Sequence, residues 1–136
     1  MKKILLLFAL TYSLKAISQE INFGKVSKEE LNEKSYSLDS TADAVYLLKK
    51  RNTFFSYDNN KGFQIVSEYH ERIKIYTKKG FRYATKKITY YEPESGDKEK
   101  ITKLKAYTFN LVKNKIERNK LSSKNIFENK LNKYRN

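Results

Sequence analysis

A strict alternation of side chains between Phe63 and Tyr76 constrains the fold more than any other feature of the sequence. Alternation with period two predicts a β-strand, and a slip by one residue would turn its buried face to solvent. We expect the more apolar parity to be the buried face, with Glu71 as its one misfit. That parity holds Phe63, Ile65, Ser67, Tyr69, Glu71, Ile73 and Ile75, and the opposite parity holds Gln64, Val66, Glu68, His70, Arg72, Lys74 and Tyr76.

Further aromatic and β-branched runs on both sides predict antiparallel neighbours for this strand. Upstream, strands are expected at 45–48 and 53–57, with a turn at 49–52 and an Asn- and Gly-containing loop at 58–62. Downstream, we expect a hairpin turn at 77–80 with Gly80 at positive φ, strands at 81–91, 101–113 and 116–120, and a surface loop at 92–100. We also expect a bulge or a strong twist near Ala106 and a tight turn at Asn114-Lys115.

Short helices are predicted near the two ends of this β-rich region. Ser27 and Glu30 fit a capping box, which predicts a helix over 27–34 that docks through Leu31. Phe127, Leu131 and Tyr134 have the i, i+4, i+7 spacing of a short amphipathic helix. The predicted class is therefore mainly β: an antiparallel sheet that resembles an incomplete β-sandwich, with a short N-terminal and a short C-terminal helix.

The first 18 residues have the organisation of a secretory signal peptide. Lys2 and Lys3 precede an apolar run from Ile4 to Leu10, and Ala16-Ile17-Ser18 supplies a small-x-small cleavage site. The run is too short to span a bilayer, which takes roughly 20 apolar residues. We expect a signal peptide at 1–18 cleaved after Ser18, an N-terminal segment with the short helix at 19–43, and an antiparallel β-domain at 44–136, in an exported protein of the periplasm or cell envelope.

Composition excludes most catalytic chemistries. The chain has no Cys and one His, which removes disulfides, thiolate catalysis and the usual Cys- or His-rich metal sites. The formal net charge is +14, and +11 without the three lysines of the signal peptide. Since 24 of the 29 basic residues are Lys and they are spread along the chain, we favour compositional drift over a dedicated polyanion site.

Candidate site residues each have a simpler structural interpretation. His70 lies on the polar parity and is expected to be a surface residue; Asp39, Asp43 and the Glu29-Glu30 pair are expected to serve as caps and solvated turns, with Asp39 capping the turn at Ser40-Thr41. The many aromatics could stack on nucleic-acid strands or glycans, but packing between strands is the better explanation. We expect no catalytic, cofactor-binding or metal site, and a protein that is not an enzyme.

Three stretches carry a resemblance to a known family. They are Asp39 with Ala42-Asp43-Ala44-Val45, the His70–Gly80 segment, and Lys105-Ala106-Tyr107-Thr108 before a turn. In this order and spacing they resemble domain of unknown function 3857, a β-rich domain of exported Bacteroidetes proteins that precedes a transglutaminase-like, papain-related domain. The resemblance implies architecture and context but no binding residue, since none is established for that domain.

The chain departs from that family in two ways. It has Asn114-Lys115 where a Gly-containing turn is usual, which implies a looser hairpin, and it ends at Asn136 where further strands and a Cys-His-Asp catalytic domain would follow. We therefore expect a truncated, non-catalytic accessory or interaction module. Its partner would be a transglutaminase-like domain or another envelope protein, or a second copy through an open sheet edge. The alternative is an autonomous basic module that binds anionic envelope polymer or nucleic acid.

Overall fold

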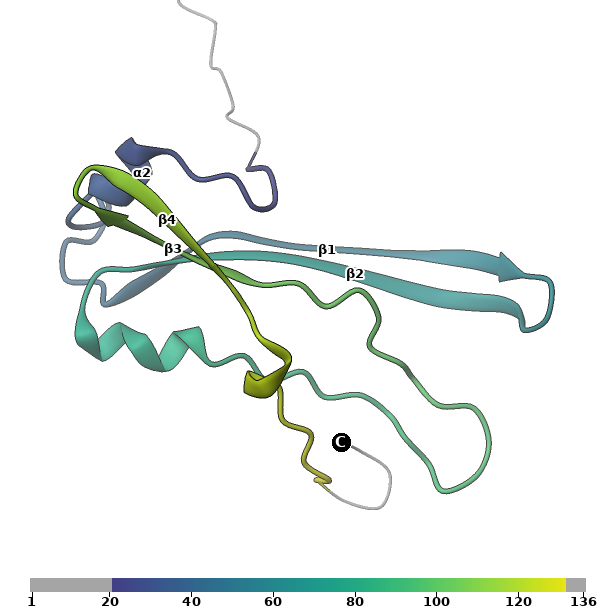
Figure 1. Ribbon diagram of the computed structural model, residues 1–136. Coiled ribbons are helices and arrows are strands. Elements are labelled where there is room, and N and C mark those ends of the chain that lie inside the picture. The colour runs from purple at the N-terminus through teal and green to yellow at the C-terminus, as the bar shows by residue number, and fades with distance from the viewer. Residues whose placement is uncertain (1–20, 132–136) are drawn as a thin grey trace, which may run out of the picture.

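The computed structural model describes residues 21–131 and has a mainly-β architecture, as predicted (Figure 1). Two antiparallel hairpins form two separate two-stranded sheets, β1 with β2 and β3 with β4. The elements in chain order are α2 (Lys28–Asn32), β1 (Ala44–Asp58), β2 (Gly62–Ile75), the 3₁₀ helix η1 (Lys78–Ala84), β3 (Tyr107–Val112), β4 (Lys115–Lys120) and the 3₁₀ helix η2 (Ser123–Asn125).

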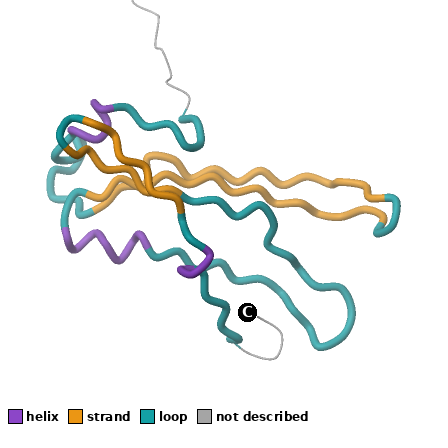
Figure 2. Tube along the Cα trace, viewed as in Figure 1, coloured by secondary structure: helices purple, strands orange, loops and turns teal. Residues whose placement is uncertain are grey.

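The β1–β2 hairpin is a long ribbon whose tip lies far from α2, β3 and β4 (Figures 1 and 2). The predicted strand at 63–76 is confirmed as β2, and the predicted loop at 58–62 closes the hairpin. There the Asp58 carboxylate accepts from the amides of Asn60 and Lys61, and Gly62 has φ +71°. The predicted turn at 49–52 is wrong, because these residues pair with 68–71 in one continuous β1.

The predicted hairpin turn at 77–80 is also wrong, since η1 begins there. Gly80 does not have positive φ; it is buried instead, and a Cβ at this position would lie 2.3 Å from the Asp43 carbonyl oxygen. The same carbonyl accepts from the amides of Tyr76 and Thr77, at 2.9 and 3.2 Å. Glycine is needed here for close approach of two backbones rather than for a left-handed turn.

The second hairpin is shorter than predicted. Residues 85–106 are almost entirely loop, so the expected strand at 81–91 is absent. The expected strand at 101–113 is confirmed only from Tyr107 to Val112, as β3, and the expected bulge or strong twist near Ala106 falls in the loop that precedes it. The one register shift lies in β1, between Tyr46 and Leu48. The β3–β4 turn has Lys113 and Asn114 at its centre, both with positive φ, one residue earlier than predicted. Two positive φ angles match the twist that a two-residue hairpin loop needs.

The predicted ends are confirmed only in part. α2 lies within the predicted 27–34 helix, and Ser27 Oγ accepts from the Glu30 amide at 3.1 Å. At the other end, 126–131 are not helical and only the single turn η2 precedes them, so the expected C-terminal helix is wrong there; Tyr134 lies outside the described residues. The predicted signal peptide at 1–18 also lies outside them.

Burial is shallow throughout the described part of the chain. No hydrophobic side chain among residues 21–131 is fully buried. Many of the half-buried ones lie at the base of the ribbon and in the elements around it, where η1 lies close to β2 and α2 lies close to β3; among them are Leu31, Val45, Leu47, Leu48, Ile73, Ile75 and Leu111. Among residues 21–131, no helix has the length and apolar character needed to cross a membrane.

Candidate interaction surface

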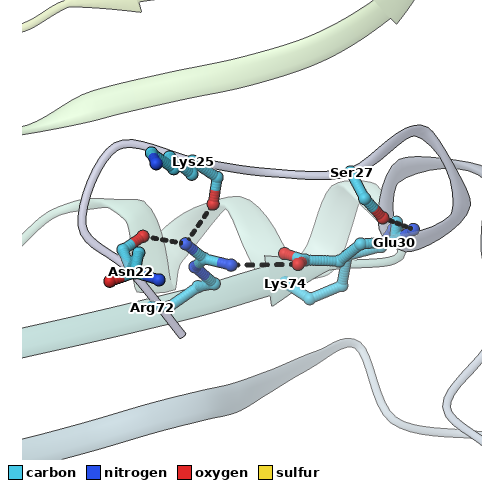
Figure 3. Close-up of polar contacts among 6 residues, drawn as sticks. All are labelled: Asn22, Lys25, Ser27, Glu30, Arg72 and Lys74. Atoms are coloured by element: carbon cyan, nitrogen blue, oxygen red, sulfur yellow. Dashed lines mark hydrogen bonds and ion pairs between the residues drawn. The ribbon is translucent and has the colours of Figure 1, made fainter. Parts of the chain in front are cut away.

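The base of β2 holds the N-terminal segment through Arg72 (Figure 3). Its Nη1 lies 3.0 Å from Glu30 Oε2, while its Nη2 donates to the carbonyls of Asn22, at 2.7 Å, and Lys25. The Arg72 side chain is 13% exposed and that of Glu30 is 25% exposed. Glu30 was predicted to close a capping box, but its carboxylate pairs with Arg72. The planar fork of arginine can reach several acceptors that a single ammonium could not.

Two more side chains of the same parity extend this contact. Lys74 Nζ donates to the Glu30 carbonyl, and the Tyr76 hydroxyl donates to Glu33 Oε2 at 2.7 Å. Burial lowers the pKa of Lys74. Burial, and then the hydrogen bond to Glu33, raise the pKa of Tyr76 to about 12. The polar parity of β2 is thus the docking face for the N-terminal segment, and Leu31, through which the helix was expected to dock, is half-buried.

An aromatic chain continues the docking face towards the second hairpin. The ring of Phe23 packs edge-on against His70, with centroids 5.4 Å apart, and lies 5.6 Å from Tyr107. Tyr107 in turn lies 6.2 Å from Phe109 and has the Arg118 guanidinium 5.1 Å from its ring centroid. His70 was expected to be a solvated surface residue; it is a half-buried packing residue instead.

The opposite face of β2 is covered near the base but not at the tip. Glu71, the misfit of the apolar parity, accepts from Lys86 Nζ at 2.5 Å, and Lys86 also donates to the Tyr46 hydroxyl at 2.7 Å. The hydrogen bond to Glu71 is the main cause that raises the pKa of Lys86. The ion pair therefore ties the loop after η1 to the base of this face, beside the half-buried Ile73 and Ile75.

Beyond this ion pair the apolar parity is open, contrary to the prediction that it is buried. Phe55 is 75% exposed, Tyr57 63%, Phe63 78% and Ile65 70%. We call this the distal face; its residues are Arg51, Thr53, Phe55, Tyr57, Phe63, Ile65, Ser67 and Tyr69, which alternate along the two strands and pair across them. Residues that alternate along paired strands share one side of the sheet.

The distal face is ordered in layers of paired side chains. Phe55 lies opposite Ile65, and Tyr57 opposite Phe63, whose rings pack edge-to-face with centroids 5.1 Å apart. The next layer is small: Thr53 and Ser67 lie opposite one another, with their hydroxyl oxygens 3.0 Å apart.

The base of the distal face is held by one arginine. Arg51 donates to the hydroxyls of Thr53 and Ser67, at 3.1 and 3.2 Å, and its guanidinium lies 5.3 Å from the ring centroid of Tyr69. These contacts fix the polar side chains, while Phe55, Phe63 and Ile65 keep 70% or more of their surface in solvent.

The other predicted candidates serve local structure. Asp39 Oδ1 accepts from the amide and hydroxyl of Thr41, at 2.9 and 2.7 Å, which confirms the predicted cap and lowers the pKa of Asp39. Asp43 accepts from the Thr77 hydroxyl. Hydrogen bonds to its own backbone amide and to Ser27 lower the pKa of Glu29. Within the described residues, no group of three or more carboxylates or histidines is placed to hold a metal ion.

The chain matches no family model, no curated protein and no solved structure. The resemblance noted in the sequence therefore stays a prediction. The sequence identified the β2 residues of the distal face, Phe63, Ile65, Ser67 and Tyr69, as one parity, but neither their exposure nor the β1 residues that lie beside them. It missed Arg72 as the docking residue. A signal was present, because Arg72 and Lys74 share one face of β2 and the helix at 28–32 has two adjacent glutamates that could pair with them.

Proposed function

We propose that this chain is an exported, non-catalytic interaction module. The signal-peptide pattern of residues 1–18 supports export, and the resemblance to domain of unknown function 3857 supports an accessory role beside a transglutaminase-like domain or another envelope protein. The absence of Cys in the sequence leaves the module without the nucleophile of such an enzyme.

The exposure of apolar side chains on the distal face is the main support for this proposal. Four large apolar side chains, each more than 60% exposed, stand side by side on one surface of a hairpin. Contiguous apolar surface of this kind marks protein–protein contacts in soluble domains. Within residues 21–131, β1 and β2 also have no further strand beside them, so both outer edges of the ribbon can accept another strand.

Photo-cross-linking in the cell that makes the protein tests the proposal. A photoreactive phenylalanine analogue replaces Phe63 in one strain and Phe127 in another; both side chains are 78% exposed, but Phe127 lies in the C-terminal loop. We expect a discrete cross-linked protein band from position 63 and none from position 127, in the envelope fraction. Equal or absent cross-linking at the two positions would contradict the proposal.

A second candidate, a binder of anionic polymer, is supported by one stretch of sequence. Residues 72–91 contain seven basic side chains and no acidic one, and Lys78, Lys79 and Arg82 are exposed on η1. Arg72 and Lys86 are already paired with carboxylates and Lys74 donates to the Glu30 carbonyl, so four of the seven cations remain for a polyanion. Binding to duplex DNA would then weaken with a log–log salt slope of about −3 to −4, and Lys78→Gln with Lys79→Gln would halve that slope. A flat salt dependence would eliminate this candidate.

A further inference from the structure

The distal face has the area of one side of a protein–protein interface. Phe55, Tyr57, Phe63, Ile65 and Tyr69 are 63–78% exposed. Large aromatic side chains offer about 150–250 Å² each and isoleucine somewhat less, so at these exposures the five present about 700 Å². Stable interfaces of standard size bury about 800 Å² on each partner. A single flat partner surface of equal size would therefore be sufficient to cover the face.

The order of the layers makes the face complementary to itself. From the tip inward come a large layer (Tyr57 and Phe63), a middle layer (Phe55 and Ile65) and a small layer (Thr53 and Ser67). Consider two copies whose distal faces lie against one another, related by a two-fold axis that passes between their middle layers and runs perpendicular to the strands. This axis would reverse the order of the layers in the second copy. Each large layer would then face a small one, which is the interdigitation that packed sheets require.

The position of Arg51 favours the same two-fold axis between the two copies. Arg51 is the charged residue of the distal face, and it lies four residues from Phe55, or about 13 Å along the strand. Under the axis across the strands, the two Arg51 side chains lie about 26 Å apart, well beyond the Debye length of about 8 Å. An axis along the strands would instead bring the two Arg51 layers together and stack the large layers on each other.

We propose that the partner of the distal face is a second copy of this chain, which packs face to face with its strands running in the opposite direction. The proposal rests on the proposed function and names the partner of that same surface. The pair is isologous, so Phe55 and Ile65 lie at its centre and contact their own counterparts.

Analytical ultracentrifugation of the protein expressed from all 136 codons tests whether two copies form a dimer and measures its dissociation constant. Phe55→Ser removes an apolar side chain from the distal face, and Phe54→Ser removes the adjacent phenylalanine from the opposite side of the ribbon. Because Phe55 is lost from both copies at the centre of the interface, we expect its dimer dissociation constant to rise by about a hundredfold or more. The dissociation constant of the Phe54→Ser dimer should change by less than about fivefold.

Spin labels at the tip test the direction. The chain has no cysteine, so Asn60→Cys provides a unique labelling site in the β1–β2 turn. Strands that run in opposite directions place the two labels about 30 Å apart, whereas strands that run in the same direction place them at about 15 Å, because stacked sheets lie about 10 Å apart. Circular dichroism of each variant establishes that the hairpin is retained.

The outcomes separate this proposal from the proposed function. A dimer that Phe55→Ser weakens, with labels about 30 Å apart, supports it. A chain that remains monomeric at every concentration, a dimer that Phe55→Ser leaves unchanged, or a label distance of about 15 Å would each overturn it. If the chain is monomeric but position 63 still cross-links to a different protein in the cell, the interaction module stands and the second copy is the wrong partner.

Discussion

Replacement of Arg72 by alanine should release the N-terminal segment from β2. The side chain serves one carboxylate and two backbone carbonyls and is 13% exposed. Hydrogen bonds to charged groups contribute about 1.5–3 kcal/mol each, and breaking a fully buried ion pair costs about 3–5 kcal/mol. Because Glu30 keeps 25% of its side chain in water, the loss should be smaller than that upper range, about 2–3 kcal/mol in the free energy of unfolding.

Urea unfolding followed by circular dichroism, at one low protein concentration, measures this loss. Arg72→Lys keeps the charge but not the fork, and should lose about 1 kcal/mol. Arg82→Ala is the matched control, since Arg82 is exposed on η1 and donates only to the neighbouring Tyr83; its effect should stay within about 0.5 kcal/mol. Amide exchange in 22–33 should accelerate in the Arg72 variants alone. Equal losses for Arg72→Ala and Arg82→Ala would refute the docking argument.

Three further predictions concern the backbone and one tyrosine. Gly80→Ala should destabilise the fold by about 1–3 kcal/mol in thermal unfolding, because its Cβ meets the Asp43 carbonyl oxygen at 2.3 Å, and an unchanged melting temperature would contradict this. Lys113→Gly should stabilise by about 0.5–1 kcal/mol, because the residue has φ +48°; a loss of stability would count against the turn. The pKa of Tyr76 is raised from 10.0 to about 12, so its contribution to stability is complete below pH 10 and is lost as the pH rises through 12; the latest step of the tyrosinate absorbance titration should disappear in Tyr76→Phe.

Local rules in the sequence predicted local structure well. The period-two pattern located β2, the Asp58–Gly62 loop closed its hairpin, and the Ser27 and Asp39 side chains cap the backbone as expected. Each of these features depends on residues close together in the chain. Their geometry follows from backbone dihedral preferences and short-range hydrogen bonds, which a sequence displays directly.

Features that depend on distant segments could not be predicted in the same way. Alternation shows which side chains share a face but not what covers the face. The base of the apolar parity is covered by η1 and Lys86, while Phe63 and Ile65 lie beyond their reach. Likewise Arg72 reads as a solvated residue, because the carbonyls that it serves lie about fifty residues earlier in the chain.

The predicted hairpin turn at 77–80 and the predicted strand at 81–91 are wrong for a common reason. The sequence places a glycine after two lysines and then a mixed apolar and basic run, which resembles a turn and a returning strand. The tight approach of Gly80 to Asp43 instead fixes a helical turn, and the residues that follow have no apolar parity to bury. A sequence pattern cannot distinguish a glycine that is needed for close approach from one that is needed for positive φ.

Hydroxyl-radical footprinting tests most directly the claim that the distal face is an interaction surface. Phe63 and Phe127 are equally exposed, so they should react equally fast in the dilute purified protein. In intact cells, we expect oxidation of Phe63 to fall about tenfold relative to Phe127, because a bound protein excludes water from the distal face. If the two phenylalanines react equally in cells as well, the distal face is open where the protein works and is not an interaction surface.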